Sequence, residues 1–540
     1  MKAQDQETIA TAAAVIKTPR ASERFEAMGT LTLKLRWHLS SRSSMLFNEI
    51  AATSALFLQW TMTNMKTILL MCLAATTGFA ATPPSVIESM QQSVTPPVVI
   101  RGEQHPPVSL ATRMSQLHVN AVSIAVIRDG KLDWARAYGI ADQERHIAAT
   151  PDTLFQAGSI SKPLAALAAL KRVDAGALDL DRNVNDYLKS WKLPDNEFTV
   201  AHKVTIRNIL NHTAGLTVWG FPGYSREGKM PSTVEVLDGK GNTPAIRVWK
   251  QPDLSWRYSG GGYTILQLLL SDQSGVPFPV LMRESVLIPL QMNHSTYEQP
   301  LPEALHPLAA SGYDRNGKKV EGDWHVYPEM AAAGLWTTPR ELAKYVIAIQ
   351  NTNLGRAHFL SPTMAHAMLT PGMNHHGLGP VITADGLRFG HGGADDGFQA
   401  EVTGFLDGRG GVVVMANSDN GGRLAQELIL TLGHLYDWPG IKPVERTVAD
   451  VPSAALDRLV GSYALPSGED AGKTEDLNVT REEAALVVTY KGTRAMTLLP
   501  ESDVKFFSRD SGNEVEFSFE DKTTTMDLGG EQKAVRHNHD

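Results

Sequence analysis

Ser159 and Lys162 are the residues of this chain whose types and spacing could most directly do chemistry. They lie three positions apart, ahead of the apolar run from Pro163 to Val173. Residues at this spacing share one face of a helix, so an amine would lie beside a hydroxyl. A serine hydroxyl attacks a carbonyl only when a neighbour takes its proton or lowers its pKa. By itself the pair also fits an ordinary capped helix, so the interpretation depends on the rest of the chain.

Pro163 limits where this helix can begin. Proline lacks the N–H that interior helical residues donate, so the helix cannot start far upstream of Ser159. We therefore expect Ser159 at or next to a helix N-terminus, where the helix dipole favours a developing oxyanion.

Two further short motifs follow along the chain. They are Arg257-Tyr258-Ser259-Gly260 and His391-Gly392-Gly393. With Ser159-Ile-Ser-Lys162 ahead of them, they resemble the serine beta-lactamase and penicillin-binding-protein superfamily. Within it, the chain is most similar to the branch of class C beta-lactamases, D-aminopeptidases and esterases. The resemblance extends over residues 110–440 and includes the phrases Asn211 to Leu216 and Ala333 to Leu342.

The resemblance implies a role for each of three side chains. Ser159 attacks an acyl carbonyl and forms an acyl-enzyme. Lys162 either takes the serine proton or holds a positive potential that favours the alkoxide. Tyr258 is the third partner, and two nearby cations could lower its pKa from the usual value of about 10. It would then pass the proton to the leaving group and later activate the deacylating water.

The resemblance also implies how the substrate is held. The backbone N–H groups of Ser159 and Ala394 form the oxyanion hole. Gly392 and Gly393 let the substrate approach an edge strand without obstruction. His391 stands where many relatives have lysine, and it lines the site.

Two departures from the family pattern bear on the substrate. Gly260 replaces an asparagine that many relatives carry, and with it an amide that would hold a substrate carbonyl. His391 replaces a fixed cation, and histidine is charged only conditionally. Both changes favour an esterase or a D-amino-acid peptidase or amidase over an efficient beta-lactamase. A true beta-lactamase is one alternative, and a penicillin-binding-like sensor or scaffold without turnover is another.

The composition excludes several other classes of function. The chain has 540 residues and a formal net charge of −8, and it shows no basic stripe, which argues against nucleic acid as a partner. We expect a small-molecule or peptide-like acyl substrate and no metal or organic cofactor. Association with the cell envelope is compatible with this interpretation, and the sequence leaves the oligomeric state open.

Residues 65–81 have the features of a secretory signal peptide. Met65-Lys66-Thr67 precedes a short apolar run, and the segment ends in the small residues Ala80 and Ala81. We expect cleavage near these two alanines and release of the mature chain into the periplasm or medium. The only cysteine, Cys72, would leave with the signal peptide. Residues 1–64 are interpreted as a mis-set upstream start or a disordered tail.

The remaining pattern predicts an α+β fold. Strands before Ser159 and after Leu387, with helices between them, suggest one antiparallel sheet built from both ends of the region. We expect an extended lead-in at 82–107, a beta-lactamase-like domain at 108–440 and a linker at 441–452. Short alternating runs in 453–536 predict a small antiparallel β domain or barrel, interpreted as accessory.

The histidines outside His391 are expected to be structural. His212 should bond within its own loop, and His375 and His376 should lie in a solvated loop. The tail histidines His537 and His539 should also be solvated. No zinc-binding spacing such as H-E-x-x-H occurs.

Overall fold

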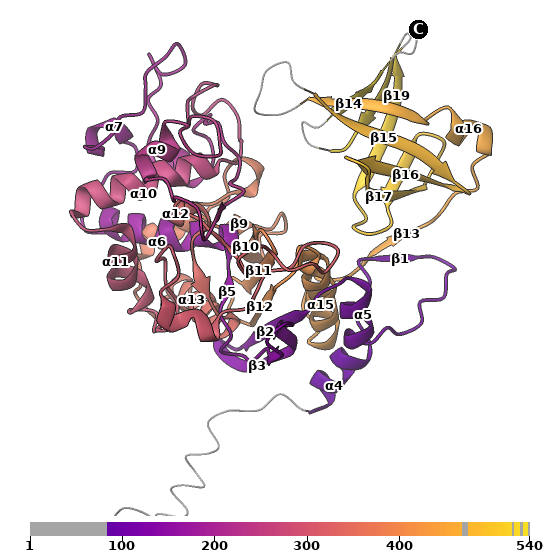
Figure 1. Ribbon diagram of the computed structural model, residues 1–540, viewed down its shortest axis with the longest axis horizontal. Coiled ribbons are helices and arrows are strands. Elements are labelled where there is room, and N and C mark those ends of the chain that lie inside the picture. Colours follow the sequence, from indigo (N-terminus) through magenta and orange to yellow (C-terminus); the bar gives the residue numbers. More distant parts are fainter. Residues whose placement is uncertain (1–83, 467–473, 521–522, 530–532, 538–540) are drawn as a thin grey trace, which may run out of the picture. The chain divides into compact units, whose positions relative to one another are not determined.

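The computed structural model describes residues 84–466, 474–520, 523–529 and 533–537 (Figure 1). Residues 1–64, the predicted signal peptide at 65–81 with Cys72, and His539 lie outside the described residues. The predictions made for them therefore stay predictions.

A seven-stranded antiparallel sheet carries the larger domain. Its order is β4-β3-β2-β12-β11-β10-β9. The strands are β2 Ala121–Arg128, β3 Lys131–Asp142, β4 Ile147–Ala148, β9 Val381–Ile382, β10 Arg388–Asp395, β11 Phe398–Phe405 and β12 Gly410–Ala416. Because β12 pairs with β2, the sheet joins the two ends of the domain. The predicted α+β class and the two-ended sheet are confirmed.

The hairpin between β2 and β3 follows from two residues. Asp129 and Gly130 both have positive φ, at 51° and 69°. A two-residue turn of this kind matches the twist of the flanking strands, and Asp-Gly is a preferred sequence for it.

Helices cover both faces of the sheet. Helix α13 (Pro339–Asn353) packs on β2, β11 and β12 on one face, and α15 (Gly421–Leu435) packs on β11 and β12 on the other (Figure 1). Helix α6 (Ser161–Asp174) is buried all round from Ser161 to Leu170, as expected of a helix in the middle of a domain. Further α-helices of the described residues are α4 Pro84–Gln92, α5 Leu110–Gln116, α7 Val184–Tyr187, α8 Ile206–Leu210, α9 Thr233–Leu237, α10 Gly260–Ser274, α11 Phe278–Met282, α12 Met330–Ala333, α14 Pro362–Leu369 and α16 Ser453–Asp457.

The segment 82–107 is less extended than predicted. It contains helix α4 (Pro84–Gln92) and strand β1 (Val98–Ile100). Proline is tolerated in the first turn of a helix, and Met90 on α4 is fully buried in the apolar cluster beneath α15. Strand β1 pairs in parallel with β13 (Val444–Arg446), which lies inside the expected linker 441–452.

The C-terminal region forms a closed eight-stranded barrel, which confirms the predicted β domain. Its strands are β14 Gly461–Pro466, β15 Thr474–Glu482, β16 Ala485–Tyr490, β17 Thr493–Pro500, β18 Lys505–Ser508, β19 Glu514–Glu520, β20 Thr523–Asp527 and β21 Lys533–Arg536. Buried side chains that include Tyr463, Leu486 and Phe517 fill its interior as a packed core.

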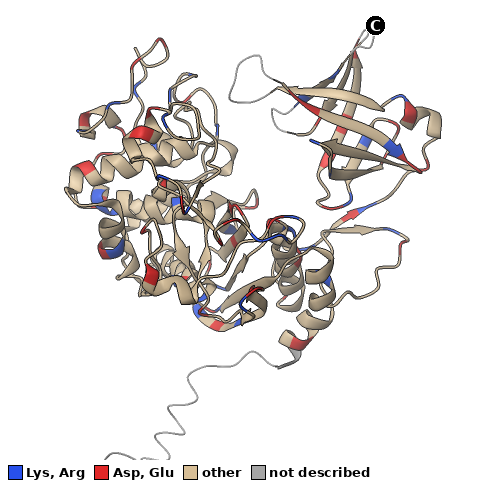
Figure 2. Ribbon diagram, viewed as in Figure 1, with Lys and Arg blue, Asp and Glu red and all other residues tan. Residues whose placement is uncertain are grey.

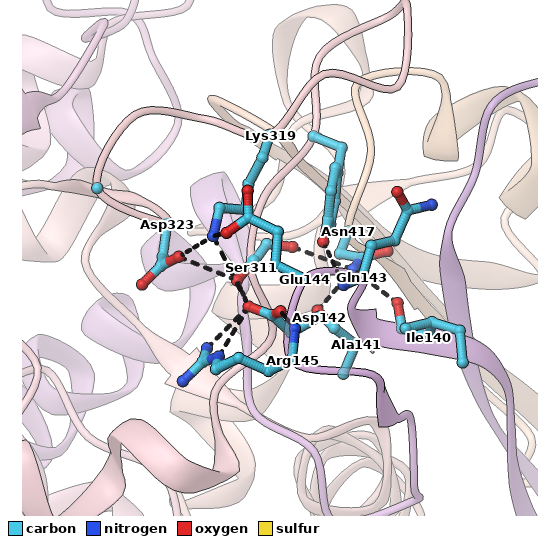
Figure 3. Close-up of polar contacts among 12 residues, drawn as sticks. Ile140, Ala141, Asp142, Gln143, Glu144, Arg145, Ser311, Lys319, Asp323 and Asn417 are labelled. Carbon is cyan, nitrogen blue, oxygen red and sulfur yellow. Dashed lines mark hydrogen bonds and ion pairs between the residues drawn. The ribbon is translucent and has the colours of Figure 1, made fainter.

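A buried polar cluster fixes the loop that follows β3. The Asp142 carboxylate accepts hydrogen bonds from the Ser311 hydroxyl and the Arg145 backbone N–H, both at 2.6 Å (Figure 3). Lys319 pairs with Asp323 at 2.7 Å. Burial opposes ionisation of Asp142, but the hydrogen bonds from Ser311 and Arg145 prevail and lower its pKa to about 2. Every charge in this cluster therefore has partners.

Charged residues elsewhere are dispersed. Basic positions are scattered among acidic ones along the ribbon rather than gathered on one element (Figure 2). In the described part of the chain, no helix combines the length and apolar character needed to span a membrane.

Candidate active site

Ser159 lies in a short 3-10 turn, Gly158–Ile160, that runs directly into α6. Gly158 has φ of +50°, and a Cβ atom there would come within 2.5 Å of the Ala394 backbone nitrogen. The turn therefore packs against β10 so closely that only glycine fits at this position. This contact fixes Ser159 at the start of the helix, where the sequence pattern predicted it.

Lys162 lies one helical turn from Ser159 and points at it. Its Nζ donates to the Ser159 hydroxyl oxygen at 2.9 Å and to the Ala332 carbonyl of α12 at 2.8 Å. The side chain is almost fully buried. Burial lowers the pKa of Lys162 to about 7, and the nearby Asp395 carboxyl opposes the shift. A large share of the amine is then neutral near pH 7 and can take a proton from serine.

Tyr258 meets both residues. Its ring centre lies 4.9 Å from the Lys162 Nζ, and its hydroxyl lies near enough to Ser159 for this serine to influence its pKa. Burial raises the pKa of Tyr258, although the nearby Ser159 hydroxyl opposes the shift. The expectation that nearby cations lower this pKa is therefore wrong, because the effect of burial dominates. Tyr258 is a neutral phenol, a proton donor rather than a base.

Strand β10 passes alongside the nucleophile turn. Successive residues of a strand point to opposite faces, so His391, Gly393 and Asp395 share one side. A Cβ atom at Gly393 would collide with the Ala157 carbonyl of that turn. The same contact brings the Ala394 backbone next to Gly158. An oxyanion hole formed by the amides of Ser159 and Ala394 is therefore sterically reasonable.

The glycines of the second and third motifs have structural explanations. A Cβ atom at Gly392 would approach the Glu401 carboxylate to 2.7 Å on the opposite face of the sheet. A Cβ atom at Gly260 would lie 3.0 Å from the Phe221 ring and 3.1 Å from the Trp219 carbonyl. An asparagine at position 260 would therefore require the Phe221 ring and the Trp219 backbone to shift by a few tenths of an ångström.

His391 is buried and neutral. Its Nδ1 donates to the Gly392 carbonyl at 2.5 Å, and its ring centre lies 6.2 Å from that of Tyr258. Burial, followed by the charge of Lys162, lowers the pKa of His391 to about 3. The position therefore provides no cation at neutral pH.

Two more histidines lie in the same region, which sequence reasoning missed. His376 is buried against His212 and Trp256, with ring centres 5.1 and 5.0 Å apart, so its expected solvated position is wrong. His212 bonds to the Tyr258 segment rather than only within its own loop. His375 and His537 are exposed or partly exposed, as expected. The buried histidines come from separate segments, so no local spacing could have revealed them.

Asp395 adds a buried carboxyl beside Lys162. Neither of its oxygens has a hydrogen-bond partner of good geometry in the described residues. Burial raises the pKa of Asp395 well above its usual range, against the opposing effects of Lys162 and the Gly158 N–H. No group of three or more His, Cys, Asp or Glu in the described ranges is arranged to hold a metal ion.

Comparisons with known proteins identify the family of this chain. A family model described as "Beta-lactamase" matches residues 109–433. Penicillin-binding protein 4* of Bacillus subtilis is 23% identical over 468 residues, which cover 79% of this chain and 97% of that protein. A beta-lactamase of Pseudomonas fluorescens is 30% identical over 237 residues, 43% of this chain and 60% of that protein. The octameric penicillin-binding protein homologue from Pyrococcus abyssi has a TM-score of 0.54 at 22% identity, covering 79% of this chain and 98% of that one. That structural likeness supports the fold alone.

Proposed function

This chain belongs to the beta-lactamase family, and from that premise we propose that it is an exported serine hydrolase that acts on a carboxylic ester or amide through an acyl-enzyme. The observation that carries the proposal is the 2.9 Å hydrogen bond between Lys162 Nζ and the Ser159 hydroxyl, with the Tyr258 ring centre 4.9 Å from the same Nζ.

Acylation uses Lys162 as the base. Its neutral amine takes the Ser159 proton while the serine oxygen bonds to the carbonyl carbon, and the carbonyl electron pair moves to oxygen. The amides of Ser159 and Ala394 stabilise that oxyanion. When the bond to the leaving group breaks, Tyr258 gives its proton to the leaving group and recovers one from the Lys162 ammonium.

Deacylation repeats these transfers with water in place of serine. Water attacks the acyl carbon and loses its proton to the Lys162 amine, and the released Ser159 oxygen takes a proton back through Tyr258. The products are a carboxylic acid and the original enzyme, so atoms and charges balance without a cofactor.

The surroundings of Ser159 favour an acyl substrate without a carboxylate at the His391 position. His391 is neutral, and no amide stands at Gly260. Both features weaken recognition of beta-lactams and of peptides ending in a free carboxylate. We therefore favour an esterase or a D-amino-acid amidase.

A labelling experiment tests the proposal. A fluorophosphonate probe should label the wild type and not Ser159→Ala, and one of three panels (p-nitrophenyl esters, D-amino-acid amides, nitrocefin) should be turned over. Turnover of nitrocefin as the preferred substrate would support the beta-lactamase alternative. Folded protein that is neither labelled nor active would contradict the proposal and favour a scaffold.

The proposed export rests on the sequence of residues 65–81 alone. We expect the mature chain to begin near Ala81 or Thr82. N-terminal sequencing of protein recovered from the cell envelope or medium tests this, and a mature chain that begins before Met65 would contradict it.

A further inference from the structure

His212 contacts the chain on both sides of Tyr258. Its backbone carbonyl accepts the Arg257 N–H at 2.8 Å, and its ring Nδ1 accepts the Ser259 N–H at 3.1 Å. The two residues that flank Tyr258 are thus bonded to one histidine. These bonds leave the tyrosine backbone little freedom to move relative to the loop after α8.

The His212 ring also packs on the Tyr258 ring. The ring centres are 4.3 Å apart with an interplanar angle of 31°. Trp219 contacts the same tyrosine, with centres 5.4 Å apart. The phenol is therefore confined by side chains as well as by its backbone, with its ring centre 4.9 Å from the Lys162 Nζ.

The bond to Ser259 fixes the tautomer of His212. Because Nδ1 accepts a hydrogen bond from the Ser259 N–H, it must carry a lone pair. The ring proton of the neutral form therefore lies on Nε2. Protonation of Nδ1 would replace the acceptor by a donor facing the Ser259 N–H. The titratable groups around this ring are Lys162, His376, His391, Tyr258 and Tyr263, and the three basic ones all disfavour a charge on it.

The backbone of His212 is held in an uncommon conformation. Its φ is +62°, in the left-handed region that only a few per cent of non-glycine residues occupy, with asparagine, aspartate and histidine enriched among them. Such conformations persist where the surroundings fix them, and they concentrate at functional sites. Here the left-handed turn is what lets one residue present both its carbonyl and its ring to the Tyr258 segment.

We propose that His212 is a positioning residue for Tyr258, which holds the phenol against Ser159 through the two backbone bonds and the stacked ring. The proposal rests on the proposed hydrolase function, because positioning matters only if Tyr258 transfers protons. His212 itself contacts no reacting atom.

Two substitutions distinguish the contribution of the hydrogen-bond acceptor of His212 from that of its stacked ring. In His212→Asn the side-chain oxygen replaces Nδ1 as acceptor, and asparagine tolerates the left-handed backbone. His212→Phe keeps an aromatic ring but leaves the buried Ser259 N–H without a partner. We expect kcat to stay within about 5-fold of wild type in His212→Asn and to fall about 100-fold in His212→Phe, with KM changed less than about 3-fold in both.

His375 offers the matched control. It is exposed and has a φ of +59°, so His375→Phe and His375→Asn carry the same backbone cost away from Tyr258. Both should keep wild-type kcat. Thermal melts of all four variants identify any loss that is due to unfolding.

Crystal structures of the two His212 variants provide a second measurement, which does not depend on turnover. The Tyr258 ring should keep its wild-type place beside Ser159 and Lys162 in His212→Asn and withdraw from it in His212→Phe. Wild-type kcat and an unmoved Tyr258 in folded His212→Phe would overturn the proposal, as would equal damage in both variants. If the wild type is folded but not labelled at Ser159, the hydrolase proposal fails instead, and the two structures still decide whether His212 holds Tyr258.

Discussion

Asp142 and Asp395 end two strands of the same sheet, and both side chains are buried, yet their surroundings shift their pKa values in opposite directions. Asp142 accepts hydrogen bonds from Ser311 and Arg145, which lower its pKa to about 2 despite burial. Asp395 has no hydrogen-bond partner of good geometry in the described residues, and burial raises its pKa. Partners, not burial alone, decide in which direction the pKa of a buried carboxyl moves.

Two lysines repeat this difference. Lys319 contacts Asp323 and Glu144, and these bonds raise its pKa against the effect of burial. Lys162 has only neutral hydrogen-bond partners, Ser159 and Ala332, and burial lowers its pKa to about 7. The cluster around Asp142 is built for stability, whereas the surroundings of Ser159 keep an amine and a phenol neutral and ready to exchange protons.

The largest expected effect comes from the lysines. Lys162→Met removes the base, so kcat/KM should fall by about 10⁴-fold. Lys319→Met is the matched control, and it should lower the melting temperature while changing kcat/KM less than about 3-fold. Comparable turnover in Lys162→Met and Lys319→Met would break the distinction between the two regions.

Tyr258→Phe should have the next largest effect, because it removes the proton for the leaving group. We expect kcat to fall about 100- to 1000-fold on amides and less on p-nitrophenyl esters, whose leaving group needs no proton. Tyr263→Phe is the control, since its hydroxyl donates to the Leu210 carbonyl although its ring centre is only 5.9 Å from Lys162 Nζ. Equal losses on both substrate types would argue against proton donation by Tyr258.

Asp142→Asn should destabilise the fold without altering the chemistry. The shift of its pKa from the ordinary 3.8 to about 2 corresponds to about 2 kcal/mol of unfolding free energy at pH 7. Because the folded pKa is the lower one, this contribution is present above pH 4 and is lost as the pH falls toward 2. Denaturant unfolding between pH 7 and pH 2 measures it. Asp186→Asn, at an exposed pair with Arg182, should change stability by less than about 1 kcal/mol.

Asp395→Asn should produce the smallest effect, a change in the pH profile. The lysine must be neutral to act, so kcat/KM should decline below about pH 7 in the wild type. The Asp395 carboxyl raises the pKa of Lys162, so its removal should move this decline to lower pH. An unmoved profile, with wild-type stability, would show that Asp395 does not influence the base.

The sequence predicted the parts of this arrangement that depend on local spacing. Ser159 and Lys162 meet because helical periodicity requires it, and the Asp129-Gly130 hairpin follows from turn chemistry. The prediction that Tyr258 lies beside Ser159 came from the resemblance to a family, because no local rule brings together residues 99 positions apart in this sequence.

Other features depend on tertiary packing and could not be predicted from the sequence. Burial sets the charge states of Tyr258 and His391, and burial cannot be read from a motif. The contact of His212 with Ser259 forms only because the loop after α8, where His212 has a left-handed backbone, lies against the start of α10. Helix α4, in the segment expected to be extended, is stabilised because Met90 packs into an apolar cluster with side chains of the distant helix α15.

The pKa of Lys162 tests the central claim most directly. Lysine labelled with ¹³C at Cε can be followed by NMR as a function of pH, with the Lys162 signal assigned by its absence in Lys162→Met. We predict a midpoint near pH 7 for this residue. A midpoint near the ordinary lysine value of about 10.4 would show that the amine is charged at neutral pH and cannot serve as the base.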